Sequence, residues 1–151
     1  MPRLIIADTS VLIIFKRIDR FDILRNLYHV ITITSPISGE FNETLPDWIE
    51  IKEVKDKKYQ KFIESHLDAG EASAIALAME YEDSLLILDD IRARKYAKQL
   101  GLTITGSLGV ISKAKESGLI DKIKPIIEKL KDHNFRISEK IIKNLLERNK
   151  E

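Results

Sequence analysis

Two short, uncharged runs of aliphatic residues constrain the fold of this chain more than any other feature. Residues 4–7 read Leu-Ile-Ile-Ala and are followed by Asp8, and residues 85–88 read Leu-Leu-Ile-Leu and are followed by Asp89 and Asp90. Short apolar runs without polar alternation are typical of strands that are buried on both faces of a parallel sheet. Each run therefore predicts an interior strand that carries acid to one edge of the sheet, where open α/β sheets bind their ligands.

Strand-like and helix-like patterns alternate along the rest of the chain, which predicts a mainly parallel sheet covered on both faces. The expected fold is a three-layer α/β/α arrangement in which residues 1–151 form one domain. The charged run 55–61 is expected to be a solvated helix face or a loop. We expect strands at 4–8, 30–33, 48–54, 85–88 and 102–105, and helices at 10–28 (broken near Asp19), from 35 to before 46, 70–79, 91–100, 108–117, 122–132 and 138–149.

The composition excludes several kinds of function. The 151 residues carry a formal net charge of +1 and include no cysteine, which removes disulfides, thiol nucleophiles and cysteine-ligated zinc. With charges so balanced, a phosphate-binding surface would need local clustering of basic residues. The apolar runs are too short to span a membrane, and Asp8 interrupts the first of them, which argues against a signal peptide. We therefore expect a cytoplasmic protein with no membrane partner.

Five carboxylates are expected at the carboxyl edge of the sheet, because each follows a strand or lies in the first turns of the next helix. Crowded carboxylates repel one another in a low dielectric, and a hard divalent cation such as Mg²⁺ or Mn²⁺ would compensate them. Such a cation can activate water and stabilise a phosphoryl transition state. We therefore predict a metal site in which Ser10 either caps a helix or orients the first acid. The five acids are Asp8, Glu40, Glu71, Asp89 and Asp90.

Most of these acids also have an ordinary structural explanation. Asp90 can cap the following helix, and Glu71 can complement a helix dipole. Glu40 can be a surface acid, with Glu43 in the functional position instead. Asp8 is the hardest to explain in this way, because it ends a buried strand and precedes an apolar helix.

Basic side chains follow the acid pair on the helix that begins after it. Arg92, Arg94 and Lys95 could hold a nucleic-acid backbone near the metal, or they could form a solvated helix face. The three histidines are scattered without the spacing of metal ligands, so we expect surface or structural roles for them. The apolar positions of the last two helices are expected to be core, with part of that surface open to a second copy or a protein partner.

Four segments in order resemble the PIN domain, a metal-dependent nuclease fold, and in particular the compact prokaryotic PIN proteins related to VapC-type toxins. Residues 106–110 and 114–120 resemble an uncharacterised PIN-like subgroup. The resemblance covers nearly the whole chain. The four segments are Ile-Ile-Ala-Asp-Thr-Ser at 5–10, Ser-Pro-Ile-Ser-Gly-Glu at 35–40, Gly-Glu-Ala-Ser-Ala-Ile-Ala-Leu-Ala at 70–78 and Leu-Leu-Ile-Leu-Asp-Asp at 85–90.

The resemblance implies that Asp8, Glu40, Glu71 and Asp90 are the catalytic acids of an Mg²⁺- or Mn²⁺-dependent endoribonuclease, with Asp89 as a further metal ligand. It also implies the toxin of a toxin–antitoxin pair, with RNA as substrate, a small antitoxin protein as partner and a homodimer as the assembly. Two motifs depart from the family pattern. The third acid, usually Asp, is Glu71, and the usual Thr-x-Asp reads Leu-Asp-Asp at 88–90.

Two other classes of function remain open from the sequence. The altered motifs would suit a PIN-like module without catalytic activity that binds RNA or a protein. An acidic sheet edge also occurs in receiver-like and dehalogenase-like phosphate-handling domains. Against these, Asp8-Thr9-Ser10 lacks the second Asp of a dehalogenase-type phosphatase, and the acid pair at 89–90 comes late in the chain, whereas a receiver carries its pair after the first strand.

Overall fold

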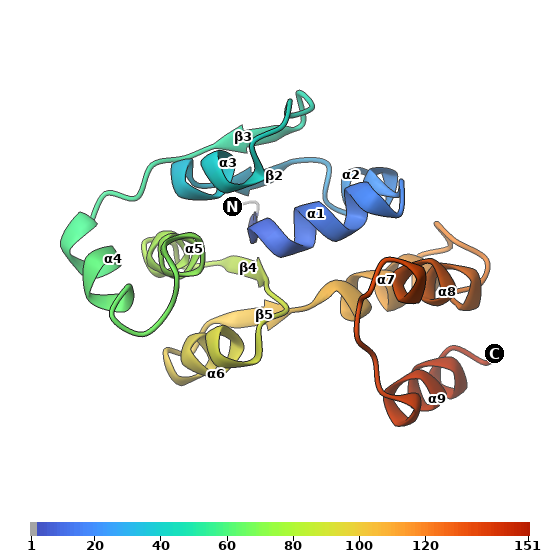
Figure 1. Cartoon of the computed structure of the whole chain (residues 1–151). Coiled ribbons are helices and arrows are strands. Elements are labelled where there is room, and N and C mark those ends of the chain that lie inside the picture. The colour runs from blue at the N-terminus through green and yellow to red at the C-terminus, as the bar shows by residue number, and fades with distance from the viewer. Residues whose placement is uncertain (1–2) are drawn as a thin grey trace.

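The computed structural model describes residues 3–151, which form a parallel sheet between layers of helices (Figure 1). The strands are β1 (Leu4–Ala7), β2 (Ile31–Ile33), β3 (Ile49–Ile51), β4 (Ser84–Ile87) and β5 (Thr103–Thr105). The helices are α1 (Thr9–Arg17), α2 (Phe21–Tyr28), α3 (Ser35–Phe41), α4 (Lys57–Ile63), α5 (Ala69–Met79), α6 (Ile91–Gln99), α7 (Ser107–Glu116), α8 (Lys124–Asp132) and α9 (Glu139–Arg148).

The sheet has the strand order β3-β2-β1-β4-β5, and each neighbouring pair is parallel. β1 lies at the centre, where Ile6 is in register with Thr32 of β2 on one side and with Leu86 of β4 on the other. All three residues are essentially inaccessible to solvent. Because the strands run in one direction, their carboxyl ends meet at one edge of the sheet, which we call the carboxyl edge.

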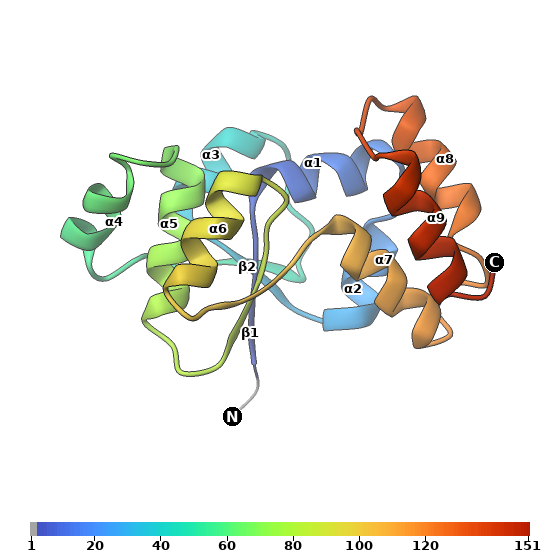
Figure 2. The same ribbon diagram turned by 90° about the horizontal axis from the view of Figure 1, so that it is seen from below.

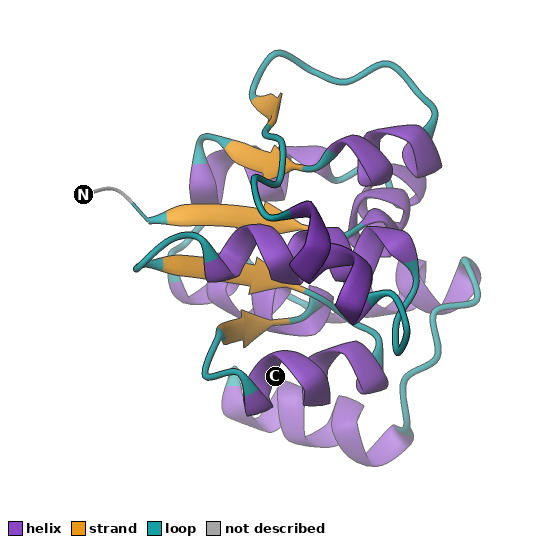
Figure 3. Ribbon diagram, turned by 90° about the vertical axis from the view of Figure 1, so that its left-hand side faces the viewer, coloured by secondary structure: helices purple, strands orange, loops and turns teal. Residues whose placement is uncertain are grey.

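Helices cover both faces of the sheet, which confirms the predicted three-layer α/β/α fold (Figure 3). Helix α5 packs on β1 and β4 and contacts α4, and α6 packs on β5. On the other face α2 packs on β2 and contacts α1 and α7, with α8 and α9 beyond α7 (Figure 2). Helix α3 contacts both α1 and α5, so it joins the two helical layers.

The predicted elements match the structure except at a few boundaries. The break expected near Asp19 within residues 10–28 is confirmed, because α1 and α2 are separate helices and Asp19 between them has a positive φ of 57°. The strand expected over 48–54 is confined to Ile49–Ile51, because this edge strand can pair only with the three residues of β2. Within the charged run, α4 begins at Lys57, where the side chain of Asp56 caps it.

Most of the apolar side chains of the last two helices belong to the core. Ile126, Ile127 and Leu130 of α8 are buried, as are Ile142 and Leu145 of α9. Most of the apolar stripe predicted from these helices is therefore covered by the chain itself. Across residues 3–151, no helix combines the length and the apolar character needed to cross a membrane.

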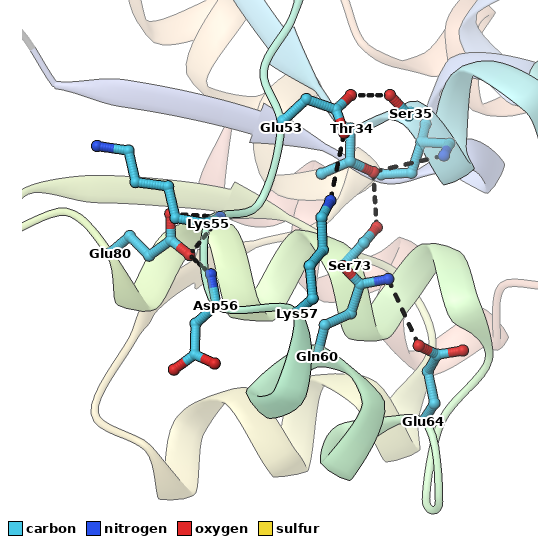
Figure 4. Close-up of polar contacts among 11 residues, drawn as sticks. Thr34, Ser35, Glu53, Lys55, Asp56, Lys57, Gln60, Glu64, Ser73 and Glu80 are labelled. Carbon is cyan, nitrogen blue, oxygen red and sulfur yellow. Dashed lines mark hydrogen bonds and ion pairs between the residues drawn. The ribbon is translucent and has the colours of Figure 1, made fainter.

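A buried chain of hydroxyl groups fixes the helix starts at the carboxyl edge (Figure 4). The Oγ1 of Thr34, directly after β2, lies 2.6 Å from the Oγ of Ser73 in α5. Ser73 in turn donates to the backbone carbonyl of Gly70 at 2.7 Å, so the Thr34 hydroxyl is the donor to Ser73. Thr34 also caps α3 by accepting from the backbone N–H of Ile37. One threonine thus ties the end of β2 to the beginnings of α3 and α5.

We expect Thr34→Val to lower the free energy of unfolding by about 1–2 kcal/mol, since valine keeps the shape but loses the cap and the buried donor. Urea denaturation followed by circular dichroism measures this change. Thr103→Val, on the exposed face of β5, is the matched control and should change stability by less than about 0.5 kcal/mol. Equal midpoints for Thr34→Val and the wild type would contradict the structural role assigned to this hydroxyl.

Candidate active site

A cavity of about 640 Å³ opens at the carboxyl edge of the sheet. All five acids predicted for the site, together with Ser10, lie around this one cavity, which we call the acidic pocket. A sixth carboxylate, Asp68, joins them, and so do two residues of the segment that links α8 to α9. The lining residues are Asp8, Thr9, Ser10, Ile13, Glu40, Asp68, Glu71, Asp89, Asp90, Phe135 and Arg136.

Asp8 is the deepest acid of the pocket, with 4% of its surface exposed. It comes directly after the central strand β1, and the apolar helix α1 follows it. Burial raises the pKa of the Asp8 carboxyl to about 7, against the lowering effect of a hydrogen bond from the backbone of Thr9. Nearby negative charge on Asp68, Glu40 and Asp89 raises the pKa further. Without a cation, the pocket therefore holds this carboxyl partly protonated at neutral pH.

Glu40 reaches the pocket from the last turn of α3. Its Oε1 accepts a hydrogen bond of 2.7 Å from the hydroxyl of Thr9, which directly follows Asp8. The carboxylate also lies against Gly70, where a Cβ would come within 2.1 Å of Oε1. The absence of a side chain at Gly70 thus makes room for Glu40. The alternative acid on this helix, Glu43, forms an ion pair with Lys16 at 2.8 Å and does not line the pocket.

Asp68 and Glu71 begin α5 with a reciprocal capping box. The Asp68 side chain accepts from the backbone N–H of Glu71 at 2.8 Å, and Glu71 accepts from the backbone N–H of Asp68. Burial raises the pKa of Glu71 to about 7, with contributions from the charges of Asp68, Asp90 and Asp8. Sequence reasoning overlooked Asp68, although the spacing of an Asp and a Glu three residues apart is the signature of such a box.

The acid pair after β4 anchors two helices. Asp89 accepts at 2.7 Å from the backbone N–H of Ser107 and at 2.6 Å from its hydroxyl, which ties the end of β4 to the start of α7. Gly106 permits this approach, since a Cβ there would lie 2.9 Å from the Asp89 carboxylate. Asp90 caps α6 by accepting from the backbone N–H of Ala93 at 2.9 Å. The capping role expected as an alternative for Asp90 is therefore present, in a residue that also faces the pocket.

The basic residues predicted to bind nucleic acid do not line the acidic pocket. Arg94 turns back into the protein and donates to the backbone carbonyl of Leu88 at 2.8 Å. Arg92 donates to the backbone carbonyl of His66 at 3.2 Å. Lys95 is exposed and lines a different cavity along α6. The cation at the pocket is instead Arg136, which no motif indicated, because its position depends on how α8 and α9 pack.

The donor set fits a hard divalent cation by its chemistry. Six carboxylates line the pocket, and carboxylate oxygens are the ligands that Mg²⁺ and Mn²⁺ prefer. Within residues 3–151, none of the six takes part in an ion pair. Across the same residues, no three acidic or histidine side chains converge closely enough to form a ready-made metal cluster. The pocket therefore supplies uncompensated charge and suitable oxygens without a closed coordination cage.

The parallel sheet and its acid-lined carboxyl edge define a class of α/β protein with an acidic pocket at its strand ends. A family model described as PIN domain matches residues 4–151, and the chain belongs to this family. PIN domains are generally nucleases, and they typically use divalent metal ions. Searches of curated proteins and of solved structures found no match to this chain.

The raised pKa of Asp8 predicts how the stability of the metal-free protein depends on pH. The folded state binds this proton more tightly than the unfolded chain, so stability falls as pH rises from about 4 to about 7. Asn cannot ionise, so the stability gained by Asp8→Asn over the wild type should be about 2–3 kcal/mol larger at pH 8 than at pH 5. Urea denaturation in EDTA, at pH 5 and at pH 8, measures the difference in the free energy of unfolding between Asp8→Asn and the wild type.

Asp121→Asn serves as the control, because this exposed acid lies outside the pocket. Its effect on stability should be the same at both pH values. If the gain from Asp8→Asn were also independent of pH, the burial of an ionisable group at this position would not have the predicted energetic effect.

Proposed function

We propose that this PIN-domain protein is a divalent-metal-dependent endoribonuclease that hydrolyses RNA at the acidic pocket. One observation carries the proposal: six carboxylates from four separate regions of the chain surround one cavity, and within residues 3–151 no ion pair neutralises them. Negative charge of this density is a cost to a protein that only has to fold. It is useful to a protein that binds Mg²⁺ or Mn²⁺ and presents the bound charge to a phosphodiester.

Within this proposal, Asp8, Glu40, Glu71 and Asp90 hold the cation, and Asp89 is a further ligand. When bound, the cation supplies positive charge to the scissile phosphate and lowers the pKa of water. Thr9 orients the Glu40 carboxylate through the 2.7 Å hydrogen bond. Ser10, which is exposed at the pocket, can donate a hydrogen bond to a neighbouring carboxylate or to a substrate oxygen.

The resemblance to VapC-type toxins supports a narrower biological role. We propose that the protein is the toxin of a toxin–antitoxin pair, that it acts as a homodimer on RNA in the cytoplasm, and that a small antitoxin protein inhibits it. The proposal predicts that the purified chain cleaves RNA on its own and that co-expression with its partner suppresses this activity.

Cleavage of a labelled structured RNA with Mg²⁺ or Mn²⁺ tests the enzymatic proposal. We expect cleavage that EDTA abolishes and that Asp8→Asn or Asp90→Asn lowers at least about a hundredfold, because each removes a charged ligand. Asn is as good a helix cap as Asp, so Asp90→Asn should preserve the start of α6. Asp56→Asn is the matched control: Asp56 caps α4 through the same kind of hydrogen bond, at 3.0 Å, and lies outside the pocket.

The outcomes separate the open classes of function. Metal-dependent cleavage that survives both Asp8→Asn and Asp90→Asn in folded protein would refute the assignment of the site. No cleavage, together with no divalent-metal binding by calorimetry at millimolar concentration, would favour the alternative of a PIN-like module that binds RNA or a protein without catalysis. Metal binding without cleavage of this RNA would point to a narrow substrate.

Gly70 offers a second test that spares the fold. The Cβ of Gly70→Ala would overlap the Glu40 carboxylate, and because Glu40 is exposed its side chain can swing away. We expect a loss of activity of about tenfold or more with stability within about 1 kcal/mol of the wild type. Gly39→Ala, next to Glu40 but with open space around its Cβ, is the control and should keep full activity. Equal activity of Gly70→Ala and the wild type would exclude Glu40 from the functional site.

A further inference from the structure

The segment that links α8 to α9 reaches the acidic pocket from outside the sheet. Figure 2 shows this link at the end of the molecule toward which β1 runs, and therefore on the side of the carboxyl edge. Phe135 and Arg136 line the acidic pocket, and both also line a second cavity of about 630 Å³. The remaining residues of the second cavity are Lys131, Asn134, Ile137 and Ser138. The two cavities therefore adjoin along these two side chains.

The backbone of this link is held in a defined turn. Helix α8 ends in a Schellman motif, in which the N–H of Asn134 bonds the carbonyl of Lys131 and the N–H of Phe135 bonds the carbonyl of Leu130. Asn134 takes the left-handed conformation that this motif requires, with a φ of 63°. Phe135 packs against the hydrophobic core. The turn thereby fixes the position from which Arg136 extends.

The two cavities share Arg136 but differ in the other charged residues that line them. The acidic pocket is lined by six carboxylates, whereas the second cavity is lined by the cations of Lys131 and Arg136 and by no acid. Lys131 pairs with Glu139 of α9 at 3.4 Å, and within residues 3–151 no carboxylate lies within ion-pair distance of Arg136. The guanidinium is exposed, so it can take a ligand without losing an existing partner. Arg136 is therefore the cation most available to bind an anion beside the acidic pocket.

We propose that Arg136 binds the phosphate of an RNA strand next to the one being cleaved, and that Phe135 supports the adjoining base. A guanidinium recognises phosphate through two parallel hydrogen bonds. An aromatic face beside such a cation is a typical platform for a single-stranded nucleotide. The substrate is accordingly single-stranded RNA that lies across both cavities. This inference extends the proposed function of the same site, and the two can fail separately.

RNA binding tests the inference without cleavage. Fluorescence anisotropy of a labelled single-stranded RNA is measured in the Asp8→Asn background with Mn²⁺ present, with and without Arg136→Ala. We expect Arg136→Ala to weaken binding by about ten- to a hundredfold. The slope of log affinity against log salt should fall in magnitude by about 0.7, the value for one phosphate contact on a single strand. Arg136→Lys should restore the slope but only part of the affinity.

Two further variants make the result specific. Phe135→Leu should weaken binding several-fold without changing the salt slope, since it removes stacking and no charge. Arg148→Ala removes an exposed arginine from the opposite end of α9, about 15 Å along the helix, and should change neither quantity. A loss of affinity for Arg148→Ala equal to that for Arg136→Ala would overturn the proposal, because the effect would then be general charge. Unchanged RNA binding by Arg136→Ala would also overturn the proposal, as would the absence of RNA binding by every variant.

Cleavage assays on the otherwise wild-type chain separate this inference from the proposed function. Cleavage by the wild type and by Arg136→Ala with the same KM and kcat would overturn the role of Arg136 and leave the nuclease proposal intact. Arg136-dependent RNA binding by a chain that cleaves no RNA would support the binding surface and count against the nuclease proposal. A raised KM for Arg136→Ala, with metal affinity unchanged by calorimetry, is the expected result.

Discussion

The parallel pairing of β1 between β2 and β4 is the constraint on which the rest of the structure depends. It buries both faces of β1 and places Asp8 at the centre of the carboxyl edge. Helices α5 and α6 begin near this buried carboxyl and bring Asp68, Glu71 and Asp90 to it, whereas Glu40 comes from the last turn of α3. The acidic pocket is thus a geometric result of strand direction, because antiparallel pairing would send alternate strand ends to opposite edges of the sheet.

The protein tolerates the crowded charge partly because the acids also have structural roles. Asp68 and Asp90 cap helices, and Asp89 holds the first residue of α7. Carboxylates at the beginning of helices face unpaired N–H groups and the positive end of the helix dipole, which offset some of their repulsion. Asp8 is the most buried of the six, and burial is the main cause of the rise in its pKa. Burial raises the pKa of Glu71 to about 7 as well, although Glu71 lies in the capping box of α5.

The sheet and the positions of the acids could be predicted from the sequence, but the partners of the basic residues could not. Uninterrupted aliphatic runs define β1 and β4, and an acid that ends a buried strand must lie at the edge of the sheet. Arg94 has the spacing of a surface residue on α6, yet its guanidinium turns back to the carbonyl of Leu88. Arg136 reaches the pocket only because of where α8 and α9 lie beyond α7, which places the link between them beside the carboxyl edge (Figure 2). Side-chain direction and contacts between distant elements have no local pattern from which they could be predicted.

The distribution of the site along the chain has a consequence for protein synthesis. Asp8 leaves the ribosome first, but Asp89 gains its hydrogen bonds only after Ser107 has emerged and α7 has formed beside the sheet. Since domains generally fold as units, a growing chain carries all six acids before Ser107 has emerged, and at that stage the pocket is not finished. If the finished pocket cleaves RNA, the growing chain cannot do so before α7 has formed beside the sheet.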